Sequence, residues 1–174
     1  KGLTIYASNM CSEIMLPSSD EWAFVCCLSS INLLHYDDWK DTDLVETMVA
    51  FLDAVMEDFI VKLEAMRDHK DPEKRLGFSF MERAYNFAKA NRALGLGVLG
   101  WHSLLQSKQL AFEGAEADKM NVEVFKNIKE RADKASKDLA KELGEPEVLK
   151  GYGRRNTTLL AIAPTTSSAF ILGQ

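Results

Sequence analysis

The chain has 174 residues, of which 47% are hydrophobic and 27% charged, and its formal net charge is −5 at pH 7. This length suits one domain or part of one, and the hydrophobic fraction argues against disorder throughout. The mild acidity gives no electrostatic reason to expect nucleic-acid binding, and no apolar run approaches the roughly 20 residues that span a bilayer. We therefore expect neither a nucleic-acid nor a membrane partner.

The predicted elements alternate between short strands and longer helices. In chain order they are a strand at 3–6, a strand at 24–28, a helix at 44–66, a loop around 71–72, a helix at 80–90, a glycine-rich stretch and helix within 94–105, a helix at 118–143, a strand at 157–162 and a helix after the polar turn 164–168. The helix at 44–66 is the clearest, because apolar residues recur there at steps of three and four. The pattern predicts one mixed α/β unit over residues 1–174, mostly helical.

Cysteine usage indicates the cellular compartment. The three cysteines are an odd number, the chain has no CxxC motif, and no basic-then-apolar leader is visible. We expect a reducing, cytoplasmic environment and no metal site. The chain starts at Lys1 and stops within an apolar stretch, so we expect a piece of a longer polypeptide; a complete small protein without its initiator Met is the alternative.

The segment Asn9-Met10-Cys11-Ser12-Glu13 carries the first candidate site. In an extended segment alternate side chains share a face, so Asn9, Cys11 and Glu13 would project together. A thiol can give or take a hydrogen atom, a carboxylate can move a proton, and an amide can hold a hydroxyl. A surface loop with an inert buried cysteine is the alternative interpretation.

Two further patterns favour packing over chemistry. Cys26 and Cys27 are adjacent, so in a strand they point to opposite faces, and two small core residues are the simplest interpretation. The glycines at 95, 97 and 100 fit GxGxxG, but a helix rather than a strand is predicted before them. Close backbone packing explains these glycines better than dinucleotide binding does.

The turn that contains Thr165, Thr166, Ser167 and Ser168 is the last candidate. It follows a predicted strand and precedes a predicted helix, so its hydroxyls and free N–H groups could cradle a phosphate. An ordinary helix cap rich in Ser and Thr is the alternative. The neighbouring pair 154–155 is two arginines, which could supply charge or simply face solvent.

Four motifs together resemble the catalytic large subunit of ribonucleotide reductase. They are the N-x-C-x-E segment 9–13 with its continuation 14–17, the segment 26–33 (CCLSSINL), the segment 92–100 (RALGLGVLG), and the late R-N pair 155–156 with the loop 163–168 (APTTSS). Their order and approximate spacing agree with that family along nearly the whole chain. Each is weak alone, but four in register are specific.

The resemblance implies a fold and a role for each site residue. The fold would be part of a ten-stranded α/β barrel with a central finger loop, with residues 1–174 as a single, incomplete unit from the C-terminal part of the barrel domain. Cys11 would be the thiyl radical that abstracts the 3′ hydrogen, Glu13 the base for the 3′ hydroxyl, and Asn9 a substrate-binding amide. Cys26 would be one of two reducing cysteines and Cys27 a bystander.

The same resemblance implies an enzyme and its partners. The loop residues Thr165, Thr166, Ser167 and Ser168 would bind the phosphates of a ribonucleotide that is reduced to a deoxyribonucleotide for DNA synthesis. The chain itself would carry no cofactor; a separate di-metal small subunit, rather than adenosylcobalamin, would supply the radical. The rest of the large subunit and a thioredoxin- or glutaredoxin-type reductant would be partners, and exposed sheet edges would allow self-association.

Some parts of the family pattern are missing from the chain. No cysteine precedes Cys11, although the family places its other reducing cysteine upstream, and the family's tyrosine pair and C-terminal cysteine pair are not found. We therefore expect the chain to be inactive alone. The competing hypotheses are a noncatalytic helical interaction module with structural cysteines, and a GxGxxG nucleotide-binding domain.

Overall fold

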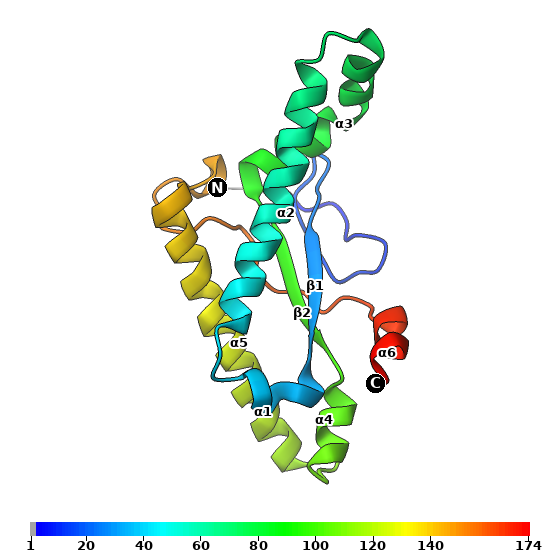
Figure 1. Ribbon diagram of the computed structural model, residues 1–174, viewed down its shortest axis with the longest axis vertical. Coiled ribbons are helices and arrows are strands. Elements are labelled where there is room, and N and C mark those ends of the chain that lie inside the picture. The colour runs from blue at the N-terminus through cyan, green and yellow to red at the C-terminus, as the bar shows by residue number, and fades with distance from the viewer. Residues whose placement is uncertain (1–2) are drawn as a thin grey trace.

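Helices surround a small sheet in the computed structural model, which describes residues 3–174. The helices are α1 (Tyr36–Trp39), α2 (Leu44–Arg67), α3 (Pro72–Asn91), α4 (Trp101–Ser107), α5 (Ala115–Leu143) and α6 (Thr166–Leu172), with 3₁₀ turns at Leu33–His35 and Glu147–Leu149. The strands are β1 (Cys27–Asn32) and β2 (Leu94–Leu99) (Figure 1). The predicted class, mixed α/β and mostly helical, is confirmed.

The sheet is parallel and joined by a helical crossover. β1 pairs with β2 in a register that runs from Cys27 opposite Leu94 to Asn32 opposite Leu99. Parallel strands need a long connection, and the α2–α3 hairpin provides it. Beyond β2, Leu160 makes a single parallel bridge to Leu96, which is all that forms of the strand predicted at 157–162. The strand predicted at 3–6 is wrong, because that segment is irregular.

The first strand lies later than the sequence pattern predicts. Residues 24–26 precede it, and β1 continues as far as Asn32. The polar pair Ser29 and Ser30 conceals this strand from an analysis that searches for apolar runs. Both serines are half-buried, and the backbone of β1 is held by β2 rather than by a uniform apolar sequence.

The long helix α2 occurs as predicted. Of the apolar residues that recur at steps of three and four, Leu52 and Leu63 are buried, but Val55 is 40% exposed. Val49, Met56 and Ile60 on the adjoining stripe are almost fully buried. α2 carries apolar residues on two adjoining stripes, and periodicity does not choose between them. The contacts of α2 with α5 and with both strands make that choice.

Helix α3 starts eight residues before the predicted start at Phe80. The Asp71 side chain accepts a hydrogen bond from the Glu73 backbone N–H at 2.9 Å, and Pro72 occupies the first turn. An Asp cap followed by Pro is a start signal for a helix rather than part of a loop. Because of this cap, α2 and α3 form a hairpin that extends beyond the end of the sheet (Figure 1).

The glycine-rich segment is strand β2, so the GxGxxG pattern is not a phosphate loop. All six residues of β2 are buried. A Cβ on Gly97 would collide with the carbonyl oxygen of Ala161, and one on Gly95 would collide with the Leu28 side chain. The glycines therefore allow neighbouring chain segments to approach closely, which confirms the packing interpretation.

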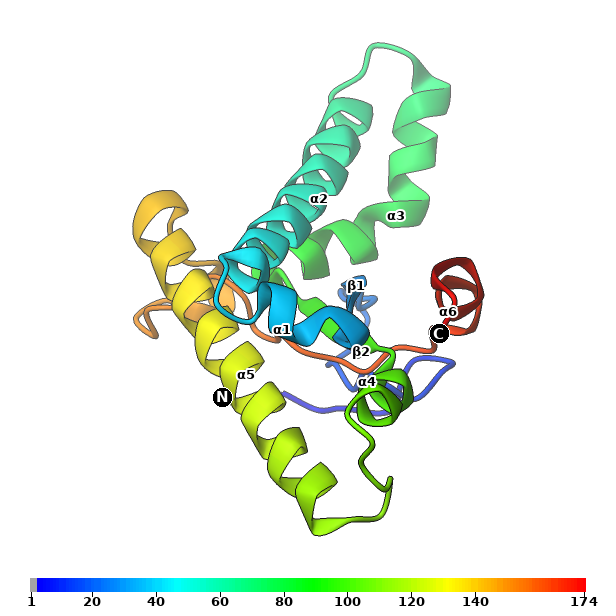
Figure 2. The same cartoon turned by 60° about the horizontal axis from the view of Figure 1, so that its bottom comes forward.

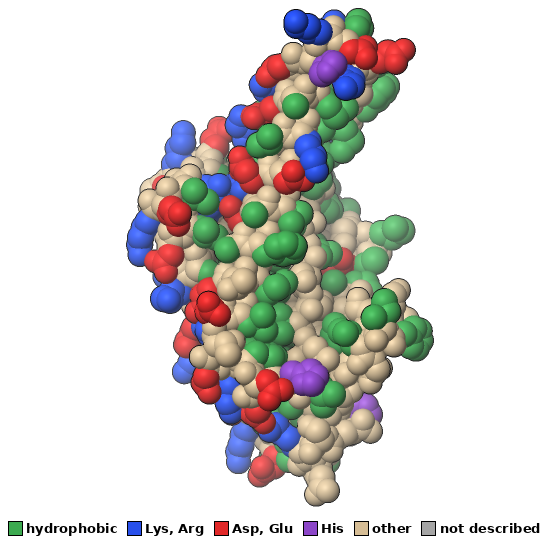
Figure 3. All heavy atoms as spheres, in the orientation of Figure 1, with side chains coloured by type: hydrophobic (Ala, Val, Ile, Leu, Met, Phe, Trp, Pro, Cys, Tyr) green, Lys and Arg blue, Asp and Glu red, His purple; other side chains and the backbone are tan. Residues whose placement is uncertain are grey.

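The elements form two layers around the strands. Figure 2 shows α2 and α5 on one side and the N-terminal segment on the other, while the segment after residue 156 runs along the edge of β2. Charged side chains crowd α5 and the α2–α3 hairpin, whereas hydrophobic side chains lie down the middle of the face in Figure 3 and over α6. No helix in the described part of the chain is long and apolar enough to cross a membrane.

Candidate active site

The segment with Asn9, Cys11 and Glu13 is a tight turn. The Asn9 N–H donates to the Ile14 carbonyl at 3.0 Å, the Ser12 N–H donates to the Asn9 carbonyl at 3.1 Å, and the Ile14 N–H donates to Asn9 Oδ1 at 3.2 Å. Ser12 has a positive φ of 64°. The expected extended segment with three side chains on one face is therefore wrong, because the Asn9 amide closes the turn locally.

The two ends of this turn have different surroundings. Cys11 is exposed at its tip as a free thiol, beside Met10, which is 97% exposed. Ile14 and Leu16, which follow the turn, are buried in a cluster that also contains Phe87 and Ala93. The turn is thus anchored from its C-terminal side, and Cys11 projects away from the anchor.

Cys26 packs against the same cluster and so lies on the side of the sheet where the turn is anchored. Its Sγ lies 3.7 Å from the Cys27 carbonyl oxygen, to which the thiol donates. A Cβ on Gly95 would lie 3.3 Å from this Sγ, so the missing side chain at Gly95 leaves room for the thiol. Cys27 packs against the two other hydrophobic clusters, which confirms that the adjacent cysteines face opposite sides.

Burial keeps the Cys26 thiol protonated. Its pKa rises to about 12, first because burial disfavours the thiolate, and then because of the charges of Cys27 and Glu13. The negative charge of Glu13 is the smallest of these three causes. A protonated thiol near a carboxylate can donate a hydrogen, whereas a thiolate cannot.

Glu13 has one carboxylate oxygen aimed into the protein. Its Oε2 is buried and has no hydrogen-bond partner among residues 3–174. A buried carboxylate oxygen without a donor is costly and calls for an explanation by function. A substrate hydroxyl that donates to this oxygen would satisfy it.

The hydroxyl-rich loop begins where the segment beside Cys26 ends. Thr166, Ser167 and Ser168 are exposed, and they form the first turn of α6, which therefore begins inside the turn predicted at 164–168 and not after it. Ala161 packs against the cluster that contains Cys26. Because four residues of chain span at most about 14 Å, Thr165 lies within that distance of Ala161.

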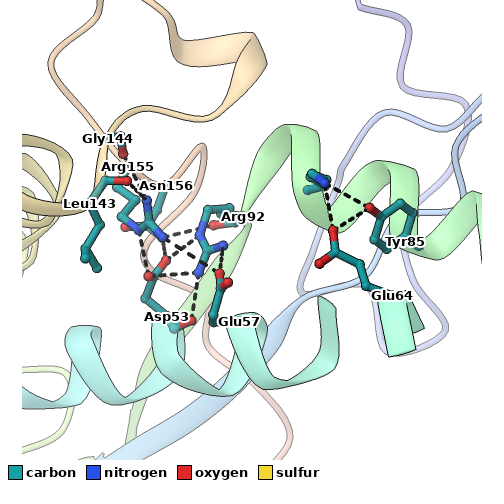
Figure 4. A network of polar contacts seen from close by, with 10 residues as sticks. Asp53, Glu57, Glu64, Tyr85, Arg92, Leu143, Gly144, Arg155 and Asn156 are labelled. Atoms are coloured by element: carbon teal, nitrogen blue, oxygen red, sulfur yellow. Dashed lines mark hydrogen bonds and ion pairs between the residues drawn. The ribbon is translucent and has the colours of Figure 1, made fainter. Parts of the chain in front are cut away.

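A buried polar network, which the sequence analysis missed, lies on the other side of the sheet. Asp53 accepts hydrogen bonds from Arg92 Nε and Nη2 at 2.9 Å each, from Arg155 Nε at 2.7 Å and from Asn156 Nδ2 at 2.9 Å (Figure 4). Arg92 also pairs with Glu57 at 2.6 Å. Asp53 lies on the apolar stripe of α2, and a carboxylate at that position is the signal that could have revealed the network.

The network corrects the earlier interpretation of the two late arginines. Arg155 is buried against Asp53 and also donates to two carbonyl oxygens at the end of α5, while Arg154 pairs with Asp133 at 3.0 Å. Both arginines are therefore held by protein groups and do not face solvent or a phosphate freely. Burial opposes ionisation of Asp53, but hydrogen bonds and charges from Arg92 and Arg155 outweigh it and lower the pKa of Asp53.

Two other features of the described residues do not belong to the predicted site. An apolar pocket of about 310 Å³, lined by Gly97, Phe125, Ile128 and Leu160 among others, contains none of the predicted site residues. No group of three or more His, Cys, Asp or Glu within residues 3–174 could hold a metal ion.

The structure thus combines a small parallel sheet, covered by helices, with a turn that carries a free thiol and is anchored on the cluster against which Cys26 packs. The family model "Ribonucleotide reductase, barrel domain" matches residues 1–148, and the chain belongs to this family. The structure superimposes on an Actinobacillus ureae class Id ribonucleotide reductase alpha subunit with a TM-score of 0.87 and 54% identity, over 98% of this chain and 31% of that one.

Sequence relatives agree with this assignment. A Frog virus 3 (isolate Goorha) relative is 42% identical over 173 residues, which are 99% of this chain and 29% of the relative. The ribonucleoside-diphosphate reductase large subunit of Invertebrate iridescent virus 6 is 39% identical over 167 residues, or 95% of this chain and 16% of that protein. The chain therefore spans less than a third of each of these three proteins.

Proposed function

We propose that this chain forms part of the catalytic core of a ribonucleoside-diphosphate reductase. Family membership and the names of the relatives support this function. The single observation that carries it is that Ile14 and Leu16, which directly follow the Asn9–Glu13 turn, and Cys26 pack in one hydrophobic cluster, while the buried Oε2 of Glu13 has no hydrogen-bond partner among residues 3–174. In the proposed enzyme, the Cys11 thiol, the Glu13 carboxylate and the Cys26 thiol act on one bound substrate.

The proposed reaction assigns one role to each residue. Cys11, as a thiyl radical, takes the hydrogen atom from C3′ while Glu13 accepts the proton of the 3′ hydroxyl. The 2′ hydroxyl leaves as water. Cys26 and a second thiol from outside this chain supply two electrons and two protons and become a disulfide, and Cys11 returns its hydrogen atom to C3′. Asn9 closes the turn that presents Cys11, and its side-chain N–H₂ could hold a substrate hydroxyl.

The exposed tip of the turn fits this proposal only with further protein around it. A thiyl radical is quenched by water-borne reductants, so Cys11 needs a cover during turnover. We infer that the rest of the large subunit provides the cover and completes the barrel. A separate radical-generating subunit supplies the radical, by analogy with the class Id alpha subunit, and a dithiol reductant reopens the disulfide.

The loop Thr165–Ser168 would bind the substrate phosphates. Its support is the exposure of three of its hydroxyl side chains and its short connection to Ala161, beside Cys26. Thr165 makes no side-chain hydrogen bond to cap α6. Its hydroxyl therefore remains available to a ligand.

Replacement of Cys11 in the whole protein tests the proposed function. Cys11→Ser should lower kcat for ribonucleotide reduction on the order of 1,000-fold or more, because serine cannot carry the radical. The unfolding free energy should change by less than about 0.5 kcal/mol, because Cys11 is exposed. Reduction is measured as deoxynucleotide formed, in the presence of a radical-generating subunit and a dithiol.

Cys27→Ser is the matched control, because it makes the same atomic change on the other side of the sheet. It should keep kcat within about threefold of wild type, since the change is a small one outside the site. Turnover by Cys11→Ser would contradict the proposal and favour a noncatalytic module. Equal losses in both variants would contradict the roles assigned here.

A further inference from the structure

The Asn156 side chain joins three elements that are distant in sequence. It is fully buried. Its Nδ2 donates to Asp53 Oδ1 at 2.9 Å and to the Arg92 carbonyl oxygen at 3.1 Å, and its Oδ1 accepts from Ser136 Oγ at 2.8 Å. The side chain therefore connects α2, the end of α3 and α5 at one point.

The chain that follows Asn156 is laid along β2. The Thr157 N–H donates to the Asn91 carbonyl at 3.2 Å, the Leu94 N–H to the Thr158 carbonyl at 3.0 Å, and the Leu96 N–H to the Leu159 carbonyl at 2.7 Å. These hydrogen bonds involve the three residues that come directly after Asn156 in the chain. A shift of residue 156 would therefore displace the segment 157–161.

The far end of this segment forms one wall of the Cys26 environment. A Cβ on Gly95 would lie 3.0 Å from Ala161 Cβ and 3.3 Å from Cys26 Sγ, so both side chains approach the same glycine. The Ala161 N–H is held by the Leu96 carbonyl at 3.2 Å. If the segment moves away from β2, this side of the thiol opens to solvent.

We propose that Asn156 is a positioning residue for Cys26, which acts by holding the segment 157–161 as a wall against the thiol. Its catalytic meaning rests on the proposed function, since Cys26 is there a hydrogen and electron donor. The wall keeps the thiol dry and at a fixed place, as a donor to one substrate carbon requires. The network on the α2 side of the sheet thereby controls a thiol on the opposite side.

The titration of Cys26 provides a readout for this proposal. Burial is the largest cause of the rise in its pKa to about 12, and the charged groups that add to it are Cys27 and Glu13. Asn156→Ala removes no charge. A fall in the pKa of Cys26 in this variant therefore reports lost burial and not altered electrostatics.

The experiment measures iodoacetamide alkylation of each cysteine in the whole protein, by peptide mass spectrometry, between pH 7 and 10. In Asn156→Ala, alkylation of Cys26 at pH 9 should rise by about tenfold or more, because the thiolate is the reactive form. Cys11 serves as the exposed standard and should not change. The alkylation rate of Cys27, which faces the other two hydrophobic clusters, should change by less than about twofold, because Cys27 stays as buried as in the wild type.

Asn127→Ala is the matched control. Asn127 is likewise an amide that joins distant elements, although it is half-buried: it donates to Tyr36 Oη and to the Lys40 carbonyl, both at 3.2 Å, and it holds α1 rather than the segment 157–161. Asn127→Ala should leave the alkylation rate of Cys26 unchanged. An unchanged Cys26 rate in Asn156→Ala would overturn the proposal, and so would an equal rise in both variants or an equal rise at Cys26 and Cys27.

Ser136→Ala decides the question if Asn156→Ala does not fold. Ser136 Oγ donates to Asn156 Oδ1 and accepts from the N–H groups of Arg155 and Asn156 at 3.2 and 3.1 Å, and Ala suits its place in α5. The rate of alkylation of Cys26 should rise by about threefold or more, because a larger fraction of the thiol is then ionised to the reactive thiolate. An unchanged rate would overturn the proposal. Alkylation needs no turnover, so a failure of the proposed function would leave this result interpretable.

Discussion

The Asp53 carboxylate lies 2.7 Å from Nε of Arg155, a residue 102 positions further along the chain. This contact joins the middle of α2 to the segment that runs beside β2. Arg92, which ends α3 with a φ of 47°, shares the same carboxylate. The crossover helices and the segment after α5 are thus fastened to one acidic side chain, which is 3% exposed.

Replacement of this carboxylate should destabilise the fold strongly. Asp53→Asn leaves Arg92 and Arg155 without their shared buried counter-charge, and breaking a buried pair in this way costs about 3–5 kcal/mol. Urea unfolding of the whole protein measures the loss. Asp133→Asn, which breaks the partly exposed pair with Arg154 at 3.0 Å, is the control and should cost less than about 1 kcal/mol. Similar losses for the two variants would contradict the structural role of Asp53.

The same carboxylate predicts a pH dependence. The pKa of Asp53 is lower in the folded chain than its usual value, so its contribution to stability is fully present above about pH 4–5 and is lost as the pH falls through the folded-state pKa. The difference in unfolding free energy between wild type and Asp53→Asn should therefore shrink as the pH falls below about 4. A difference that stays constant across this range would show that the charge of Asp53 does not stabilise the fold.

The two glycines with close neighbours should respond differently to alanine. Gly97→Ala places a methyl group against the Ala161 carbonyl oxygen, which is backbone and cannot move freely, so we expect a loss of about 2 kcal/mol or more. Gly77→Ala, inside α3, meets only the flexible end of Met66 at 2.8 Å and gains helix propensity of about 0.5–1 kcal/mol. Thermal unfolding measures the stability of both variants. If Gly97→Ala does not lower the stability, the segment beside β2 is not closely packed.

The hydroxyl side chains in the first turn of α6 should affect substrate affinity. If its hydroxyls bind phosphate in the ground state and the transition state alike, the double variant of Thr166→Ala and Ser167→Ala should raise KM about tenfold and leave kcat nearly unchanged. Steady-state kinetics of the whole enzyme measure both constants. Ser79→Ala, which removes an exposed hydroxyl bonded within α3 at 2.7 Å, is the control and should alter neither. A large fall in kcat with an unchanged KM would argue against phosphate binding by the loop.

The amino-acid sequence by itself determined the long helices, the family and the positions of the candidate residues. Helices α2 and α5 are visible because their periodicity repeats within a few residues, and the motifs around Cys11, Cys26 and Thr165 are contiguous. The opposite facing of Cys26 and Cys27 was also predictable, because it follows from strand geometry alone. Information of this kind is local, and local physical rules suffice to interpret it.

Only the tertiary structure decided which stripe of α2 is buried, that the glycine-rich segment is a strand, and that the Asn9–Glu13 segment turns. It also revealed the network around Asp53, whose partners lie 39 to 103 residues away. The physical reason is the same in each case. Contacts between residues that are distant in sequence decide where a charge is buried, where a glycine has no room for a side chain and which of two apolar stripes is buried. Such contacts produce no periodic pattern in the sequence.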